Sequence, residues 1–384
     1  MNITRRTFAS FLAAAPALSF SQSSPWSMQA DPAVPQFLDA LPCRTGLSFA
    51  APGGRALVGQ GSFTLAGGNW IPWPSSKLWR AWTATRPPNN SANIDATHSG
   101  TYWRAKCRTD SVDPIFALGG GTATNFARVL IRAADGTMRY VSQDGIALPG
   151  KTVSGAPGNF LQVFLPYSGC EVWIEGMGNT SFGGAYLRPG ESLQPVAGQR
   201  RVIVLGDSVD AGVGTTLAAD NCYAVGLGAL GDARCSGIGG QGLITTAGGW
   251  TLMDRIGPDT AGAGLIGLAM GINDRSKPYG ALLAAYTGCL QWLVTNRPGV
   301  PILAMEPTPT GRWPDPQMLT VCQAIRDAVA ALASPMIRFV PVASVVQNAA
   351  QFYRADGQDL SHPSPQGHIG LGRIIAGQVA AVLA

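Results

Sequence analysis

The chain has 384 residues, which is long for one compact domain and suits two. Hydrophobic residues make up 46% of it and charged residues only 13%, a composition that excludes an intrinsically disordered protein. The formal net charge of +5 is small and the basic residues form no run, so we expect no nucleic-acid partner. After residue 30, no apolar stretch is long enough to cross a membrane, so no membrane span is expected.

The first 20 residues, MNITRRTFASFLAAAPALSF, join an arginine pair to a modest apolar run and an Ala-Pro-Ala. This order is typical of an export signal, which takes no part in the fold. Thr4, Arg5, Arg6 and Phe8 resemble the twin-arginine pattern. We therefore expect residues 1–30 to be an export signal and lead-in, and the mature protein to be periplasmic or secreted.

Seven cysteines are present, and none has the CxxC spacing of a zinc or redox site. No cluster of histidines and carboxylates suggests a metal either, so we expect no metal and no other cofactor. An oxidising compartment permits disulfides. Two candidate pairs are Cys107 with Cys170 and Cys222 with Cys235, although the sequence cannot establish connectivity.

The first half of the chain, residues 36–195, is a series of short β runs separated by Gly, Pro, Asn and Asp. Asp135-Gly136 lies between two of these runs and is a strong hairpin signal. Short strands with a turn about every ten residues predict an antiparallel β-sandwich. The clearest runs are TYWRAKC at 101, PIFAL at 114, ARVLIR at 127, TMRYVS at 137, FLQVFL at 160 and CEVWIE at 170.

The second half, residues 199–384, alternates strands, glycine turns and helices. This alternation predicts a mostly parallel sheet with helices on both faces, an α/β fold. Strands are predicted at 201–205, 233–236, 265–270, 301–305 and 337–340. Helices are predicted near 221–230, 278–295, 316–333 and 369–383.

Several polar stretches follow the predicted strands of the second half. Ser208 lies two residues after the strand VIVLG, the stretch CSGIGGQG begins at 235, and MGIND begins at 270. Because parallel strands end at the same edge of a sheet, we expect Ser208, a glycine of the second loop and Asn273 to meet there. The alternative is that Ser208 only forms a turn. The other stretches, which occur in the matching order, favour the catalytic role over this alternative. Asp207, Asp274 and Asp356 are expected to fix turns by accepting backbone N–H groups.

The scarcity of histidine narrows the choice of a general base. Of the three in the chain, His98 lies in a polar loop and is expected to be solvated, and His368 is expected to cap or pack. His362 follows Asp359 by three residues, a spacing that lets the carboxylate orient the imidazole. We therefore expect Ser208, His362 and Asp359 to form a catalytic triad. The Ser208 N–H, a glycine N–H and the Asn273 amide are the candidate oxyanion donors.

The stretches GDSV, the glycine-rich second loop, GIND and DLSH resemble the four blocks of the GDSL or SGNH hydrolase family, in order and spacing. The resemblance implies a flavodoxin-like α/β/α domain of three layers over residues 199–384. It also implies Ser208 as nucleophile, Asn273 as an oxyanion donor, and Asp359 with His362 as the dyad. Gly240 is the best match to the family's glycine, and Gly239 is the alternative.

The chain departs from the family pattern at Asp210, where many members carry Thr. An acid at this position either disfavours anionic substrates or caps the following helix, and we favour the cap.

The resemblance implies a serine esterase, and the first half resembles the jelly-roll domain that precedes the SGNH domain in some bacterial carbohydrate acetylesterases. We therefore expect hydrolysis of small acyl esters, acetyl above all, on a carbohydrate. The alternatives are a polysaccharide O-acyltransferase, a lipase or thioesterase of the same family, and a glycan-binding module without activity. Four tryptophans suit either sugar stacking or the sandwich core: Trp70, Trp73, Trp79 and Trp82. The oligomeric state is left open.

Overall fold

The computed structural model describes residues 36–37, 44–67, 69–72, 79–82, 102–120, 125–133, 135–141, 145–148, 158–177, 180–354 and 359–384. For residues 36, 37, 44, 69, 71, 72 and 79–82 it describes the backbone only. Several predictions lie outside this range: those for the export signal, Cys43, Trp73, His98 and Asp356.

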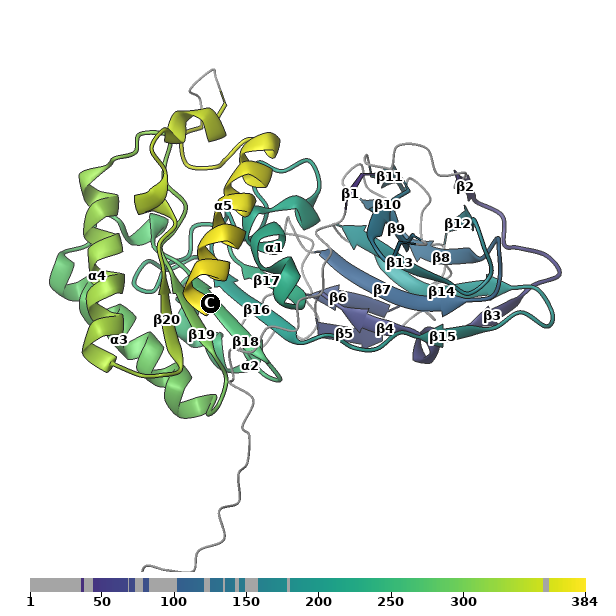
Figure 1. Cartoon of the computed structure of the whole chain (residues 1–384), viewed down its shortest axis with the longest axis horizontal. Helices are drawn as coiled ribbons and strands as arrows, with labels where there is room; N and C mark the ends of the chain where they lie inside the picture. Colours follow the sequence, from purple (N-terminus) through teal and green to yellow (C-terminus); the bar gives the residue numbers. More distant parts are fainter. Residues whose placement is uncertain are drawn as a thin grey trace, which may run out of the picture.

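The first part of the structure is a β-sandwich, as predicted (Figure 1). Its two sheets are antiparallel except for one parallel pair, β1 with β10. The first sheet contains β1 (Gln36–Phe37), β10 (Met138–Tyr140), β9 (Phe126–Arg132), β13 (Cys170–Met177), β7 (Tyr102–Thr109), β15 (Leu193–Pro195), β11 (Ile146–Ala147) and β4 (Thr64–Ala66). The second contains β2 (Arg44–Ser48), β12 (Asn159–Phe164), β8 (Ile115–Gly119), β14 (Ser181–Leu187), β6 (Trp79–Trp82), β5 (Asn69–Pro72) and β3 (Ala56–Val58).

Apolar side chains from both sheets of the sandwich meet in one core. Trp70 belongs to this core, because its ring packs edge-on against Trp103 at 5.1 Å and Phe182 at 6.4 Å between ring centroids. Core packing is therefore the role of Trp70. The predicted Asp135-Gly136 hairpin is present between β9 and β10, with Gly136 at φ 83°.

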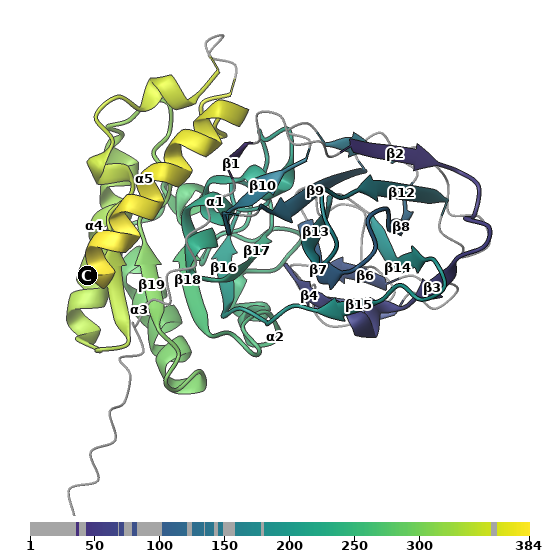
Figure 2. The same ribbon diagram turned by 45° about the vertical axis from the view of Figure 1, so that its right-hand side comes forward.

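The second part is a three-layer α/β/α fold, also as predicted (Figures 1 and 2). Its sheet is wholly parallel. The strand order is β17 (Asp232–Gly237), β16 (Arg201–Gly206), β18 (Leu265–Ala269), β19 (Ile302–Met305) and β20 (Ile337–Val340). The helices are α1 (Cys222–Leu227), α2 (Ile256–Asp259), α3 (Tyr279–Asn296), α4 (Pro316–Leu332) and α5 (Pro365–Leu383).

Burial on both faces explains why these strands are uninterrupted apolar runs. In β16, Val202 and Val204 pack with α1 and α5, whereas Ile203 and Leu205 pack with α3 and α4. All four side chains are fully buried. The central sheet is therefore rigid, and the loops at its carboxyl edge are held on a fixed support.

Two helices differ from the prediction. Helix α5 begins at Pro365, four residues before the predicted start, because Ser364 caps it by accepting the N–H of Gly367 at 3.0 Å. The short helix α2 was not predicted, since a single turn of four residues carries no periodic signal. Among the described residues, no helix is both long and apolar enough to cross a membrane.

Buried charges join the sandwich to the α/β part. The ammonium group of Lys106 in β7 pairs with the carboxylate of Asp232 at the start of β17. Arg128 of β9 is held by Glu175 at 2.7 Å and by Asp220 at 2.8 Å, and Asp220 lies just before α1. Burial lowers the pKa of Lys106, and the charge of Asp232 opposes that shift. Lys106 and Arg128 thus each pair with a carboxylate of the α/β part across the boundary.

Neither candidate disulfide is formed, since the six cysteines among the described residues are buried free thiols. In the β7–β13 pairing, Cys107 lies opposite Val172, so Cys170 is its diagonal neighbour. Diagonal neighbours are about 7–8 Å apart, too far for a disulfide. The thiol of Cys235 contacts the side-chain oxygen of Asn221 at 3.6 Å, not Cys222.

Candidate active site

Ser208 lies where β16 gives way to a tight turn at the carboxyl edge of the parallel sheet. The N–H of Val213 donates to the Ser208 carbonyl at 3.0 Å, and the N–H of Ala211 donates to the Asp207 carbonyl at 2.9 Å. The side chain of Asp207 accepts the N–H of Val209 at 3.0 Å, the turn-fixing role expected for it. The turn is therefore fixed by its own backbone, while the serine side chain is left to face the neighbouring loops.

The structure brings Ser208, His362 and Asp359 into one hydrogen-bonded chain. His362 Nε2 lies 2.8 Å from Ser208 Oγ, and His362 Nδ1 lies 2.6 Å from Asp359 Oδ2. Asp359 Oδ1 accepts the backbone N–H groups of Ser361 at 2.9 Å and of His362 at 3.1 Å. This is the geometry that a nucleophile, a base and an orienting carboxylate require.

The surroundings of Asp359 in this hydrogen-bonded chain favour its ionised form. Partial burial raises the pKa of Asp359, but hydrogen bonds from the His362 ring and from the Ser361 and His362 backbone outweigh it and leave the pKa below its usual value. The Asp359 side chain is 42% exposed and that of His362 is 24% exposed. Asp359 therefore remains charged at neutral pH, and the imidazole is open to a substrate.

The second loop approaches Ser208 from β17. A Cβ placed on Gly239 would lie 3.8 Å from Ser208 Cβ, so the Gly239–Gly240 corner stands beside the serine. Gly240 has φ 75°, a left-handed conformation that favours glycine. The Asn273 amide Nδ2 donates to the carbonyl of Gln241 at 2.9 Å, which ties the third block to this loop. All predicted site residues therefore meet at one edge of the sheet.

Asp274 holds the same loop by hydrogen bonds to its backbone, as expected for a turn-fixing carboxylate. It accepts the N–H of Leu243 at 2.7 Å and of Thr245 at 2.8 Å. A Cβ on Gly242 would lie 2.2 Å from Asp274 Oδ1, so only glycine permits this close approach. The fully buried Asp274 therefore sets the path of the loop after Gly240.

The expectation that Asp210 caps a helix is wrong. Asp210 is fully buried beneath the turn, and neither of its carboxyl oxygens accepts a backbone N–H among the described residues. The alternative, a charge that repels anionic substrates, fails as well, because the side chain does not reach the surface. Burial is the main cause that raises the pKa of Asp210 well above its usual value, which favours the neutral acid.

His368 has the capping and packing role expected for it, although it lies within the first turn of α5 and not before the helix. Its Nδ1 accepts the N–H of Cys222 at 3.2 Å at the start of α1, and its Nε2 lies 3.0 Å from the carbonyl of Val213. This pattern requires a neutral ring with the proton on Nε2. Burial lowers the pKa of His368 to about 4, in agreement with that tautomer.

Residues 204–368 match the model of the GDSL-like lipase/acylhydrolase family. No curated protein gives a significant sequence match.

Several solved structures share the two-part fold. A salicylyl-acyltransferase, SsfX3, from a tetracycline biosynthetic pathway is 16% identical with a TM-score of 0.65, over 86% of this chain and 98% of that one. A family two carbohydrate esterase from Clostridium thermocellum, solved with cellohexaose, is 14% identical with a TM-score of 0.55, over 83% and 97%. A GDSL-like lipase from Bacteroides ovatus, itself described as putative, is 12% identical with a TM-score of 0.55, over 86% and 98%. At such identities the likeness establishes the fold.

The three-layer α/β/α fold and the matched sequence blocks define a carboxylic ester hydrolase of the SGNH type. Within that class, residues 204–368 form a GDSL-like lipase/acylhydrolase domain.

Proposed function

We propose that the protein is a serine esterase that removes small acyl groups, acetyl above all, from a carbohydrate through an acyl-enzyme on Ser208. The observation that carries the proposal is the continuous hydrogen-bonded chain from Ser208 through His362 to Asp359, with contacts of 2.8 Å and 2.6 Å. No other described histidine has both a serine hydroxyl and a carboxylate within hydrogen-bonding distance.

The reaction follows from the positions of these groups. Ser208 Oγ attacks the ester carbonyl while its proton passes to His362 Nε2, and Asp359 stabilises the imidazolium that forms. When the tetrahedral intermediate collapses, the ester C–O bond breaks and His362 returns the proton to the leaving alcohol. Water then attacks the acyl-enzyme by the same route, which releases the carboxylic acid and restores Ser208.

The negative oxygen of the intermediate needs donors on the opposite side of Ser208. We assign this role to the Ser208 N–H, the Gly240 N–H and the second N–H of the Asn273 amide. Gly240 is proposed over Gly239 because it has the left-handed conformation at the corner. Loss of one such donor typically costs about 3 kcal/mol of activation free energy.

Two features support a small acyl group and a carbohydrate alcohol. The loops around the site, residues 212–220, 239–250 and 271–280, are rich in glycine, threonine and charge, so they offer little of the roughly 0.8 kcal/mol that burial of each methylene would supply. The hypothesis of a carbohydrate substrate comes from the shared fold with the Clostridium thermocellum esterase, whose complex contains cellohexaose.

The test compares wild type with Ser208→Ala on p-nitrophenyl acetate, butyrate and octanoate, and on an acetylated xylan or cellulose from which free acetate is measured. We expect Ser208→Ala to lose nearly all activity and kcat/KM to fall from acetate to octanoate. Ser48→Ala, which removes an exposed hydroxyl on the sandwich, is the matched control. Near-normal activity of Ser208→Ala would contradict the assignment of the nucleophile, and a steady rise toward octanoate would indicate a lipase or thioesterase.

Acyl transfer to an alcohol other than water is the second candidate, and the shared fold with the salicylyl-acyltransferase favours it. The two functions use the same acyl-enzyme and differ only in its acceptor. Hydrolysis predicts free acetate at the same rate with or without an added oligosaccharide. Transfer predicts an acetylated oligosaccharide and little free acetate.

A further inference from the structure

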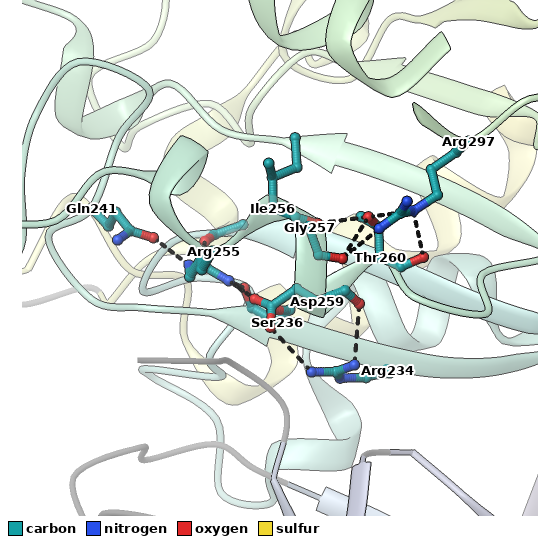
Figure 3. Close-up of polar contacts among 10 residues, drawn as sticks. Arg234, Ser236, Gln241, Arg255, Ile256, Gly257, Asp259, Thr260 and Arg297 are labelled. Carbon is teal, nitrogen blue, oxygen red and sulfur yellow. Dashed lines mark hydrogen bonds and ion pairs between the residues drawn. The ribbon is translucent and has the colours of Figure 1, made fainter. Parts of the chain in front are cut away.

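Arg255 is a fully buried cation behind the second loop, and it was not singled out from the sequence (Figure 3). It lies directly before α2, and each of its guanidinium nitrogens has a partner. Nε donates to the side-chain oxygen of Gln241 at 2.6 Å. Nη1 donates to the carbonyl and the hydroxyl of Ser236, each at 2.7 Å, and Nη2 donates to the carbonyl of Gly206 at 3.2 Å.

These partners are the supports of the proposed oxyanion site. Gly206 ends β16, two residues before Ser208, and Ser236 lies at the end of β17, where the second loop begins. Gln241 follows Gly240, and its carbonyl accepts the Asn273 amide at 2.9 Å. One guanidinium thus contacts the segment that leads to Ser208 and the second loop directly, and is linked to Asn273 through Gln241.

The charge of Arg255 is neutralised within the same cluster. Asp259 Oδ2 lies 2.6 Å from Arg255 Nη1 and accepts the Ser236 hydroxyl at 2.6 Å. Arg234 donates to the Asp259 carbonyl at 3.1 Å. Because these groups are buried and mutually hydrogen-bonded, the guanidinium has one arrangement available to it.

We propose that Arg255 is a positioning residue for the oxyanion side of the active site, acting through the Gln241 side chain on the second loop and on the Asn273 amide. This inference rests on the proposed function. Oxyanion donors lower the barrier only when they are held in place before the reaction, and a loop of glycines has no side-chain packing to hold it. Arg255 supplies that support because it also donates to the carbonyls of Ser236 in β17 and Gly206 in β16.

The first variant is Gln241→Ala, which removes the acceptor of Arg255 Nε but leaves the backbone carbonyl that receives Asn273 and leaves the Arg255–Asp259 pair intact. We expect kcat on p-nitrophenyl acetate to fall about tenfold to a hundredfold, less than for direct loss of a donor, with KM changed by less than about twofold. The acid limb of the kcat/KM pH profile should not move, because the Ser208–His362–Asp359 chain is untouched. Titration of Ser208 with a phosphonate inhibitor gives the concentration of active sites, so that kcat is calculated per folded enzyme molecule.

Arg255→Lys is the second variant, since lysine keeps the charge beside Asp259 but cannot reach Gly206, Ser236 and Gln241 together. We expect a loss of kcat similar to that of Gln241→Ala, and the double variant should lose little more than either single one. If Arg255→Lys does not fold, Gln241→Ala alone decides the question.

Arg297→Gln is the matched control. Arg297 holds the other side of the α2 segment by donating to the carbonyl of Thr260 at 3.1 Å and its hydroxyl at 2.9 Å (Figure 3). Its hydrogen-bond partners among the described residues do not include the second loop. We expect Arg297→Gln to lower the melting temperature while leaving kcat unchanged. Wild-type kcat in Gln241→Ala, or an equal loss of kcat in Arg297→Gln, would overturn the proposal for Arg255. Failure of the proposed function is a separate result, activity that survives in Ser208→Ala.

Discussion

His368 gives the structure a defined sensitivity to acid. Its neutral ring joins α5 to the N–H of Cys222 and to the carbonyl of Val213, so a proton on Nδ1 would break the bond from Cys222 and leave a charge without an acceptor. Burial lowers the pKa of His368 from 6.5 to about 4. The folded state therefore binds this proton more weakly than the unfolded state does.

The sign and size of the effect follow from linkage. Because the folded pKa is depressed, the stabilising contribution of neutral His368 is full above about pH 6.5 and decreases as the pH falls toward 4. A difference of about 2.5 pKa units corresponds to roughly 3 kcal/mol in total, of which about 2 kcal/mol is lost between pH 7 and pH 4.5. We expect His368→Gln, which keeps a donor and an acceptor but cannot titrate, to lack this loss.

The assay is urea unfolding of wild type and His368→Gln at about pH 7 and pH 4.5. Other groups titrate alike in both proteins and cancel in the difference between their free energies of unfolding. We expect the variant to be less stable than wild type at pH 7 and to recover about 2 kcal/mol relative to wild type at pH 4.5. A difference that does not change with pH would refute the assignment of a buried neutral ring.

Three further predictions concern other groups. Burial raises the pKa of Asp207 to about 6, so the stability that the protonated acid contributes is lost as the pH rises through 6. Relative to wild type, Asp207→Asn should therefore gain up to about 3 kcal/mol in free energy of unfolding between pH 4 and pH 8, and a difference between the two proteins that is the same at both pH values would contradict this. Asp359→Asn should retain more esterase activity than His362→Ala, because the base keeps its contact with the serine, and equal, complete losses in kcat would show that the carboxylate is indispensable. Replacement of Arg5 and Arg6 by lysine should leave the precursor in the cytoplasm in a fractionation experiment, whereas unchanged export would exclude the twin-arginine route.

Much of the α/β part could be predicted because its signals are local. A strand buried on both faces is a short apolar run, and each of the five runs lies within two residues of an observed strand. The meeting of Ser208 and His362 at 2.8 Å could also be anticipated, since the carboxyl ends of parallel strands share one edge and few histidines were available.

Residues that act through the fold could not be predicted in this way. Asp210 lies two residues after Ser208 and reads as a helix cap, yet the turn directs it into the interior, where burial decides its charge. Arg255 stands 19 positions after Ser236, in a segment without a periodic pattern, and its spacing of four residues from Asp259 is the one local signal that could have indicated an ion pair. Its contacts with Gly206 and Gln241 depend on three-dimensional neighbours that no local pattern encodes.

The composition of the second loop explains why such charges are buried beside it. Residues 237–242 include four glycines, which allow the backbone to pass close to Ser208 but provide no side chains to pack. Because the glycines have no apolar side chains, the hydrophobic effect cannot fix the conformation of this loop. Hydrogen bonds to fixed groups must do so instead. Asp274 supplies them to the N–H groups after Gly242, and Arg255 supplies them through Gln241. The buried ion pair of Arg255 with Asp259 therefore contributes a defined loop geometry more than it contributes net stability.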